Sequence, residues 1–213
     1  MVCHGSGCGV TFSNCTFTDC TLLVLHGAHA TLVSPQFSRS TSSRTGTPVY
    51  ASGTGTVVQL DGGSITGGTF GVCVDEGAHL EASSVTVCAV EVLGVLVQGR
   101  KTTAELSHCI IGDSRRFKSW SVHSGASVGV RVCSGGAAKV TGVTVRGVEQ
   151  GCEVHTRGKA ALQGCTLKDI TSNMLDVCGR GSELGVHQGW LQGFCIKGSN
   201  ACSGVRVLSL IHI

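Results

Sequence analysis

Two sets of polar side chains recur in this chain at matching intervals of 22 and 23 residues. The first set is Arg131, Glu153 and Asp176. The second set lies two residues further along and is Cys133, His155 and Cys178. Two neighbouring carboxylates repel, so that one pKa rises and an acid and a base can stand side by side. Two thiols and an imidazole are ligands that a transition metal accepts.

A third group of reactive side chains is clustered in segment 112–125. It comprises Arg115, Arg116, Lys118 and Trp120. The cationic groups can donate to carboxylate, sulfate or phosphate oxygens, and the indole offers a flat face on which a sugar or base can stack. This combination suits an acidic saccharide. The alternative is an ordinary solvated loop whose aromatic residues fold back onto the domain.

The elements that must position these residues are repeats led by glycine. Residues 71–74, 94–97, 129–132, 151–154 and 193–196 each begin with glycine and place a variable residue between two apolar ones. Most neighbouring copies, including looser ones, lie 22 to 26 residues apart. A period in that range indicates a solenoid, in which each repeat is one turn of a stack.

The remainder of each repeat predicts two further short strands. Residues 12–19 parallel residues 162–169 position for position, and both segments alternate apolar with polar side chains. Turns rich in Gly, Ser, Thr and Asn separate the strands, and no segment predicts an amphipathic helix. Three strands per turn, each adjacent to its equivalent in the next turn, indicate a parallel β-helix.

With these features the chain resembles the right-handed parallel β-helix family, the pectate-lyase-like or pectin-lyase fold, over about residues 8–207. The resemblance rests on repeat length, on long insertions at one corner, and on two-residue turns between the second and third strands. Those turns are 13–14, 83–84, 107–108, 141–142 and 163–164. The resemblance implies an all-β solenoid of about eight coils, whose long loops wall a groove floored by the first strand.

In such a solenoid the first set should form an exposed column on the first strand. The variable position of successive repeats is occupied by Cys73, Leu96, Arg131, Glu153, Asp176 and Cys195. Adjacent strands are about 4.8 Å apart, so Arg131, Glu153 and Asp176 should stack. A surface ion-pair ladder, a ligand-binding strip and a catalytic carboxylate pair are the three interpretations.

The second set should form a parallel column, Asp75, Gln98, Cys133, His155, Cys178 and Lys197. The outer ligands of a metal at Cys133, His155 and Cys178 would come from backbones about 10 Å apart, whereas tetrahedral coordination needs ligand atoms within about 2.3 Å of one ion. The same separation exceeds the limit of about 7 Å between the Cα atoms of a disulfide. We therefore expect no metal and no cofactor.

Composition agrees with a narrow β-helix interior, because only 4% of residues are aromatic and 32 are glycine. The net charge of +3 indicates no nucleic-acid partner, and the absence of a long apolar run indicates no membrane insertion. The chain has 13 cysteines, and several occupy positions that are valine in other repeats. They are expected to be free core thiols, which favours a cytoplasmic location, although the resemblance implies that such enzymes are often extracellular.

The repeats predict a single domain over residues 1–207, with 1–7 disordered. Residues 208–213 look like translated sequencing-adapter sequence and are excluded from the domain. Neither end offers a capping element, so an uncapped fragment of a protein with further domains is expected.

Two functions are compatible with these features. The preferred hypothesis is a non-catalytic recognition or scaffold domain that binds a glycan or protein partner along the first-strand face. The alternative is an extracellular polysaccharide lyase or glycosidase, with an acidic substrate against Arg131, Glu153 and Asp176. The motifs that the resemblance implies for pectate lyases and polygalacturonases are missing, which favours the first hypothesis.

Overall fold

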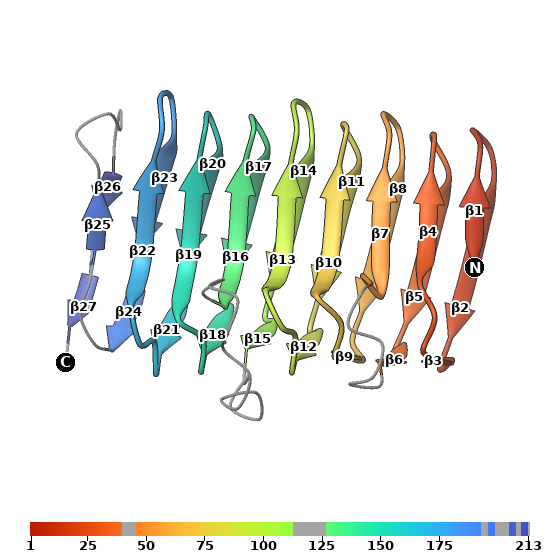
Figure 1. Ribbon diagram of the computed structural model, residues 1–213, viewed down its shortest axis with the longest axis horizontal. Helices are drawn as coiled ribbons and strands as arrows, with labels where there is room; N and C mark the ends of the chain where they lie inside the picture. Colours follow the sequence, from red (N-terminus) through yellow and green to blue (C-terminus); the bar gives the residue numbers. More distant parts are fainter. Residues whose placement is uncertain (40–45, 113–126, 193–195, 199–204, 208–209, 213) are drawn as a thin grey trace.

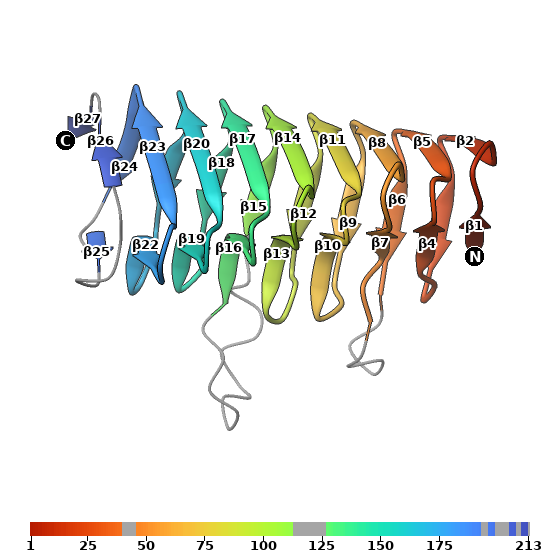
Figure 2. The same ribbon diagram turned by 90° about the horizontal axis from the view of Figure 1, so that it is seen from above.

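The computed structural model describes residues 1–39, 46–112, 127–192, 196–198, 205–207 and 210–212. Within these residues the chain forms three parallel sheets of nine strands each and no helix. Three consecutive strands belong to three different sheets, and each strand pairs with the one three further along. The coils therefore stack side by side along one axis (Figures 1 and 2). This confirms the predicted parallel β-helix.

We name the sheets A, B and C in chain order. Sheet A contains β1 (Val2–His4), β4 (Leu22–Leu25), β7 (Val49–Ser52), β10 (Phe70–Asp75), β13 (Leu93–Gln98), β16 (Val128–Cys133), β19 (Gln150–His155), β22 (Asn173–Cys178) and β25 (Ile196–Gly198). Sheet B contains β2 (Gly9–Ser13), β5 (His29–Val33), β8 (Val57–Asp61), β11 (His79–Ser83), β14 (Thr103–Ser107), β17 (Ala137–Thr141), β20 (Lys159–Gln163), β23 (Glu183–His187) and β26 (Val205–Val207). Sheet C contains β3 (Thr16–Thr18), β6 (Gln36–Ser38), β9 (Ser64–Thr66), β12 (Thr86–Cys88), β15 (Ile110–Gly112), β18 (Thr144–Arg146), β21 (Thr166–Lys168), β24 (Gly189–Gln192) and β27 (Leu210–His212).

The core consists of columns of stacked buried side chains. They form because each inward-facing residue pairs in register with the equivalent residue of the next coil. Sheet A contributes the buried column Val24, Ala51, Val74, Val97, Val132, Val154 and Val177. Sheet B contributes Leu32, Leu60, Ala82, Leu106, Val140, Leu162 and Val186. Small and branched side chains fill this narrow interior, which explains the low aromatic content.

The corner between sheets B and C is the short turn that the sequence predicts. Its second residue has a positive φ in every predicted copy, for example at Asn14 (54°), Ser84 (57°) and Gly164 (61°). This left-handed conformation turns the chain sharply, and small polar residues and glycine tolerate it. The following residue returns to the core, as at Cys109 and Cys165, which are buried.

Buried hydroxyl groups stabilise the corner between sheets A and B by hydrogen bonds to the backbone. Thr56, Thr102 and Ser182 are fully buried there. The Thr56 hydroxyl donates to the Ser52 carbonyl oxygen over 2.9 Å, and the Ser182 hydroxyl donates to the Cys178 carbonyl oxygen over 2.8 Å. The Ser182 contact holds the end of β22, where one of the predicted site residues lies.

Strands are present near both ends of the described chain. Val2–His4 form β1 and pair with Leu23–Leu25, so this segment is an ordered strand; backbone bonding to β4 and the burial of Cys3 hold it. Leu210–His212 form β27 and pair with Gly189–Leu191, so sheet C continues past residue 207.

Candidate functional site

The outer face of sheet A brings the first set of predicted residues together. Glu153 on β19 lies directly opposite Arg131 on β16 and opposite Asp176 on β22. The three side chains therefore occupy three consecutive strands of one sheet, as their spacing predicts.

Glu153 is nevertheless not exposed, which corrects the prediction of an exposed charged column. Only 4% of its side chain is accessible, whereas 33% of the Arg131 side chain is. Nε of Arg131 donates to Oε2 of Glu153, and Nε2 of His155 lies 3.3 Å from the same oxygen. A carboxylate of this depth needs such partners because an unpaired buried charge is costly. Glu153 is therefore the buried centre of the cluster rather than one step of a surface ladder.

Asp176 has a separate environment. It is partly exposed, and its Oδ2 accepts a hydrogen bond from Nδ2 of Asn173 over 3.3 Å on the same strand. Glu153 and Asp176 thus use different donors. The two carboxylates are therefore stabilised by separate neighbours.

The second predicted column also stacks in register, with His155 directly opposite Cys178. Sγ of Cys178 contacts Nδ1 of His155. Cys133 follows Val132, which pairs with Val154, so Cys133 lies one strand from His155 on the other side. Across the described ranges, no group of three or more His, Cys, Asp or Glu side chains is arranged to hold a metal ion.

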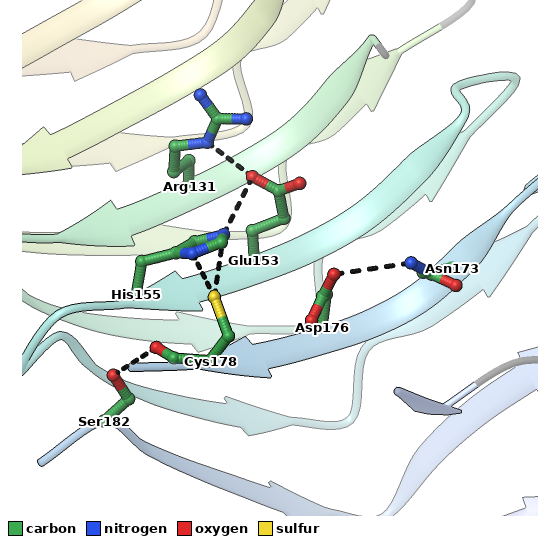
Figure 3. A network of polar contacts seen from close by, with 7 residues as sticks. All are labelled: Arg131, Glu153, His155, Asn173, Asp176, Cys178 and Ser182. Carbon is green, nitrogen blue, oxygen red and sulfur yellow. Dashed lines mark hydrogen bonds and ion pairs between the residues drawn. The ribbon is translucent and has the colours of Figure 1, made fainter. Parts of the chain in front are cut away.

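The two columns are therefore one network (Figure 3). The His155 ring lies between the Cys178 thiol and the Glu153 carboxylate, and Arg131 holds the carboxylate from the neighbouring strand. Sequence reasoning treated the columns separately and missed this link. The signal was present, because residues two apart on a strand point to the same face.

A second network on the same face joins Asp75 and Gln98, which the sequence placed side by side, to Tyr50, which it did not single out. The Tyr50 hydroxyl donates to Oδ2 of Asp75 over 3.0 Å, and Nε2 of Gln98 donates to that oxygen over 3.3 Å. The pKa of Tyr50 is raised mainly because the side chain is partly buried, while a hydrogen bond with Ser52 opposes the shift and the Asp75 carboxylate adds to it.

Apolar residues cover part of this face, which corrects the predicted exposure of Cys73 and Leu96. These outward side chains are only 4% and 7% exposed, because they pack with Leu93 and Val128 at the ends of their strands. Burial, with smaller effects of Asp75 and Cys133, raises the pKa of the Cys73 thiol to about 12. The outer face of sheet A therefore changes along the stack from an apolar cluster to the polar network.

The last predicted repeat has a different register from the one expected. Ile196 pairs with Leu175 and Lys197 with Asp176, so Lys197 belongs to the Arg131 column instead of the Cys178 column. The shift is two residues. Cys195 and the loop residues Arg115, Arg116, Lys118 and Trp120 lie outside the described residues.

An open depression of about 650 Å³ lies over sheet B, on another face. Small residues such as Ala161 and Gly185 line it, together with charged ones that include Lys159 and Glu183. These two charged groups form an exposed ion pair 3.1 Å apart. Exposed pairs of this kind contribute little to stability.

Comparison with known families agrees with this architecture. Residues 2–167 match the family described as the right handed beta helix region. The chain belongs to the right-handed β-helix family. No curated protein and no solved structure matches the chain. Among the residues that the structure describes, no helix is long and apolar enough to cross a membrane.

Proposed function

We propose that this β-helix is a non-catalytic recognition or scaffold domain, and that it binds an acidic glycan or peptide along the outer face of sheet A. The observation that carries the proposal is the anchored guanidinium of Arg131. Its Nε binds the buried Glu153, and its terminal nitrogens lie on the side away from His155 and Cys178 (Figure 3). A fixed planar donor with a third of its side chain exposed is suited to a carboxylate or sulfate oxygen.

The environment of the carboxylates supports recognition over catalysis. A general acid or base must reach the proton that it transfers, and Glu153 is buried with Arg131 and His155 against one oxygen. Asp176 is more accessible, but its Oδ2 already accepts a hydrogen bond from Asn173. The alternative of a polysaccharide lyase or glycosidase rests on the position of Glu153 opposite Asp176 on adjacent strands.

Binding of the purified chain to an array of carboxylated and sulfated glycans and acidic peptides tests the proposal. Arg131→Lys keeps a positive charge but loses the planar donor pair, so affinity for the bound ligand should fall about ten-fold. Arg100→Lys is the matched control, because Arg100 is exposed in a turn, and should bind as the parent does. Equal binding by both variants, or binding to no acidic ligand, contradicts the proposal.

A parallel assay addresses the enzymatic alternative. The chain is incubated with polygalacturonate, alginate and sulfated glycans, and unsaturated or reducing ends are measured. We expect none to be released. Release that disappears in Glu153→Gln or Asp176→Asn, with the fold retained by circular dichroism, would establish the enzyme instead.

A further inference from the structure

We propose that Cys178 is a nucleophilic thiol that exchanges with low-molecular-weight disulfides, with His155 as the base and Glu153 as the group that orients it. The site is independent of the recognition proposed above, because it requires no ligand on the Arg131 guanidinium. It concerns the opposite end of the network, where β22 reaches its corner.

The geometry follows the order nucleophile, base and orienting group. Sγ of Cys178 contacts Nδ1 of the His155 ring, and Oε2 of Glu153 lies 3.3 Å from the other ring nitrogen. A thiol beside an imidazole whose second nitrogen faces a carboxylate is the arrangement that activates cysteine nucleophiles. Arg131 fixes the carboxylate, and Ser182 fixes the backbone of Cys178. Every group in the relay is therefore positioned by a neighbour.

The exchange needs no oxidant or reductant other than the disulfide itself, and His155 accounts for the proton. Nδ1 of His155 takes the thiol proton, and the thiolate attacks one sulfur of the disulfide. A bond forms between Cys178 and that sulfur while the original S–S bond breaks. The departing thiolate takes the proton from the imidazolium, which Glu153 has stabilised. The products are a mixed disulfide on Cys178 and one free low-molecular-weight thiol.

Burial separates Cys178 from the core thiols. Cys178 is partly exposed, and 30% of the His155 side chain is accessible. Cys152 is fully enclosed, and burial, with smaller effects of Cys165 and Glu153, raises its pKa to about 12. Burial also raises the pKa values of Cys109 and Cys165, although backbone hydrogen bonds oppose the shift. A thiol that stays protonated and enclosed does not compete for the disulfide.

Other charged and titratable residues lie on the same strands and in the adjoining turns. Arg131 and Cys133 face it from β16, Asp176 precedes it on β22, and Arg157 and Arg180 lie in the adjoining turns, where the Arg157 amide bonds the Arg180 carbonyl oxygen. All of these groups remain in place in the His155→Gln variant.

The test uses the reduced full chain and dithiodipyridine, a small disulfide, with the rate at each cysteine followed by peptide mass spectrometry. Cys88 is the internal control, because it is also partly exposed on a strand but contacts the Thr66 hydroxyl instead of an imidazole. At pH 6 we expect Cys178 to react about ten-fold faster than Cys88, since thiolate formation outweighs the accompanying loss of nucleophilicity. His155→Gln should remove this advantage and leave the Cys88 rate unchanged.

The pH profile of the parent chain provides a measurement that needs no variant. An unassisted thiol loses thiolate about ten-fold per pH unit below its ordinary pKa. Between pH 8 and pH 6 the rate at Cys178 should therefore fall less than ten-fold, while the rate at Cys88 falls more than thirty-fold. Parallel profiles, faster modification of Cys133 than of Cys178, or an unchanged Cys178 rate in His155→Gln would each overturn the proposal.

Discussion

Cys152 lies between Val130 and Leu175 in one inward column of sheet A. Its thiol is completely buried, and the pKa is raised from 9.0 to about 12 because burial disfavours the thiolate. The folded chain therefore keeps a proton that the unfolded chain releases above pH 9. Stability from this group is full at neutral pH and decreases as the pH rises from about 9 towards 12.

Replacing Cys152 with valine should remove this pH dependence with little change in packing, because valine already occupies the column. We expect the free energy of unfolding of the parent chain to lose about 1.4 kcal/mol from this thiol by pH 10, and the variant to lack that loss. Urea unfolding at pH 7, 9 and 10 measures it. Val130→Cys is the converse control and should steepen the decrease; identical pH profiles for all three chains would refute the assignment.

For single residues, the sequence predicted the burial of cysteines better than the burial of charged side chains. Replacement by valine in other repeats indicated core thiols, and Cys109, Cys152 and Cys165 are buried. The burial of Glu153 was not predicted, because it depends on the side chains of Arg131 and His155 folding over it. Repeat spacing shows which residues are neighbours, whereas the depth of a charge depends on how those neighbours pack.

Among the strand elements, the glycines at the second position of sheet A strands are required for a steric reason. A Cβ on Gly129 would lie 2.7 Å from the Gly151 carbonyl oxygen and 2.3 Å from Cγ1 of Val145 in sheet C. Gly71, one of its equivalents, has the same conflict with Gly94 and Val87. Glycine therefore recurs where sheets A and C approach each other closely, and the repeat is recognisable because this contact recurs in successive coils.

Gly129→Ala should consequently destabilise the domain by at least about 2 kcal/mol, because the methyl group meets backbone as well as side chain. Gly185 on β23 is the matched control, since a Cβ there meets no atom within 4 Å. Gly185→Ala should be neutral or slightly stabilising. Chemical denaturation of both variants compares them; equal stability would show that the close approach is absent.

The register of strands was predicted where several repeats agree and missed where one repeat stands alone. Alternation of apolar residues determines which face a residue uses, but a shift of two residues preserves that alternation. The segment 193–196 fits the pattern, yet Ile196 pairs with Leu175 instead of Val177. In the central coils, glycine, strand and corner positions all constrain the same alignment, and the predicted pairings are confirmed.

For the whole molecule, repeat length and corner turns were sufficient to predict the parallel β-helix. They could not show that the outer face of sheet A carries both the apolar cluster around Leu96 and the polar network around Glu153. Those features arise between coils, from side chains about one repeat apart in sequence. Both functional proposals therefore depend on one property of the fold. Each repeat of the sequence adds one strand to each sheet, so equivalent residues of successive repeats become neighbours.

Cross-linking across sheet B tests this property most directly. Lys139 and Ala161 are exposed and directly opposite on β17 and β20, whereas Glu105 lies one strand further from Ala161. Strands about 4.8 Å apart place the first pair within disulfide range and the second pair, at about 9.6 Å, beyond it. With mild oxidation and peptide mapping, Lys139→Cys with Ala161→Cys should form a bridge, and Glu105→Cys with Ala161→Cys should not. A bridge only in the second pair, or in neither, would contradict the stacking.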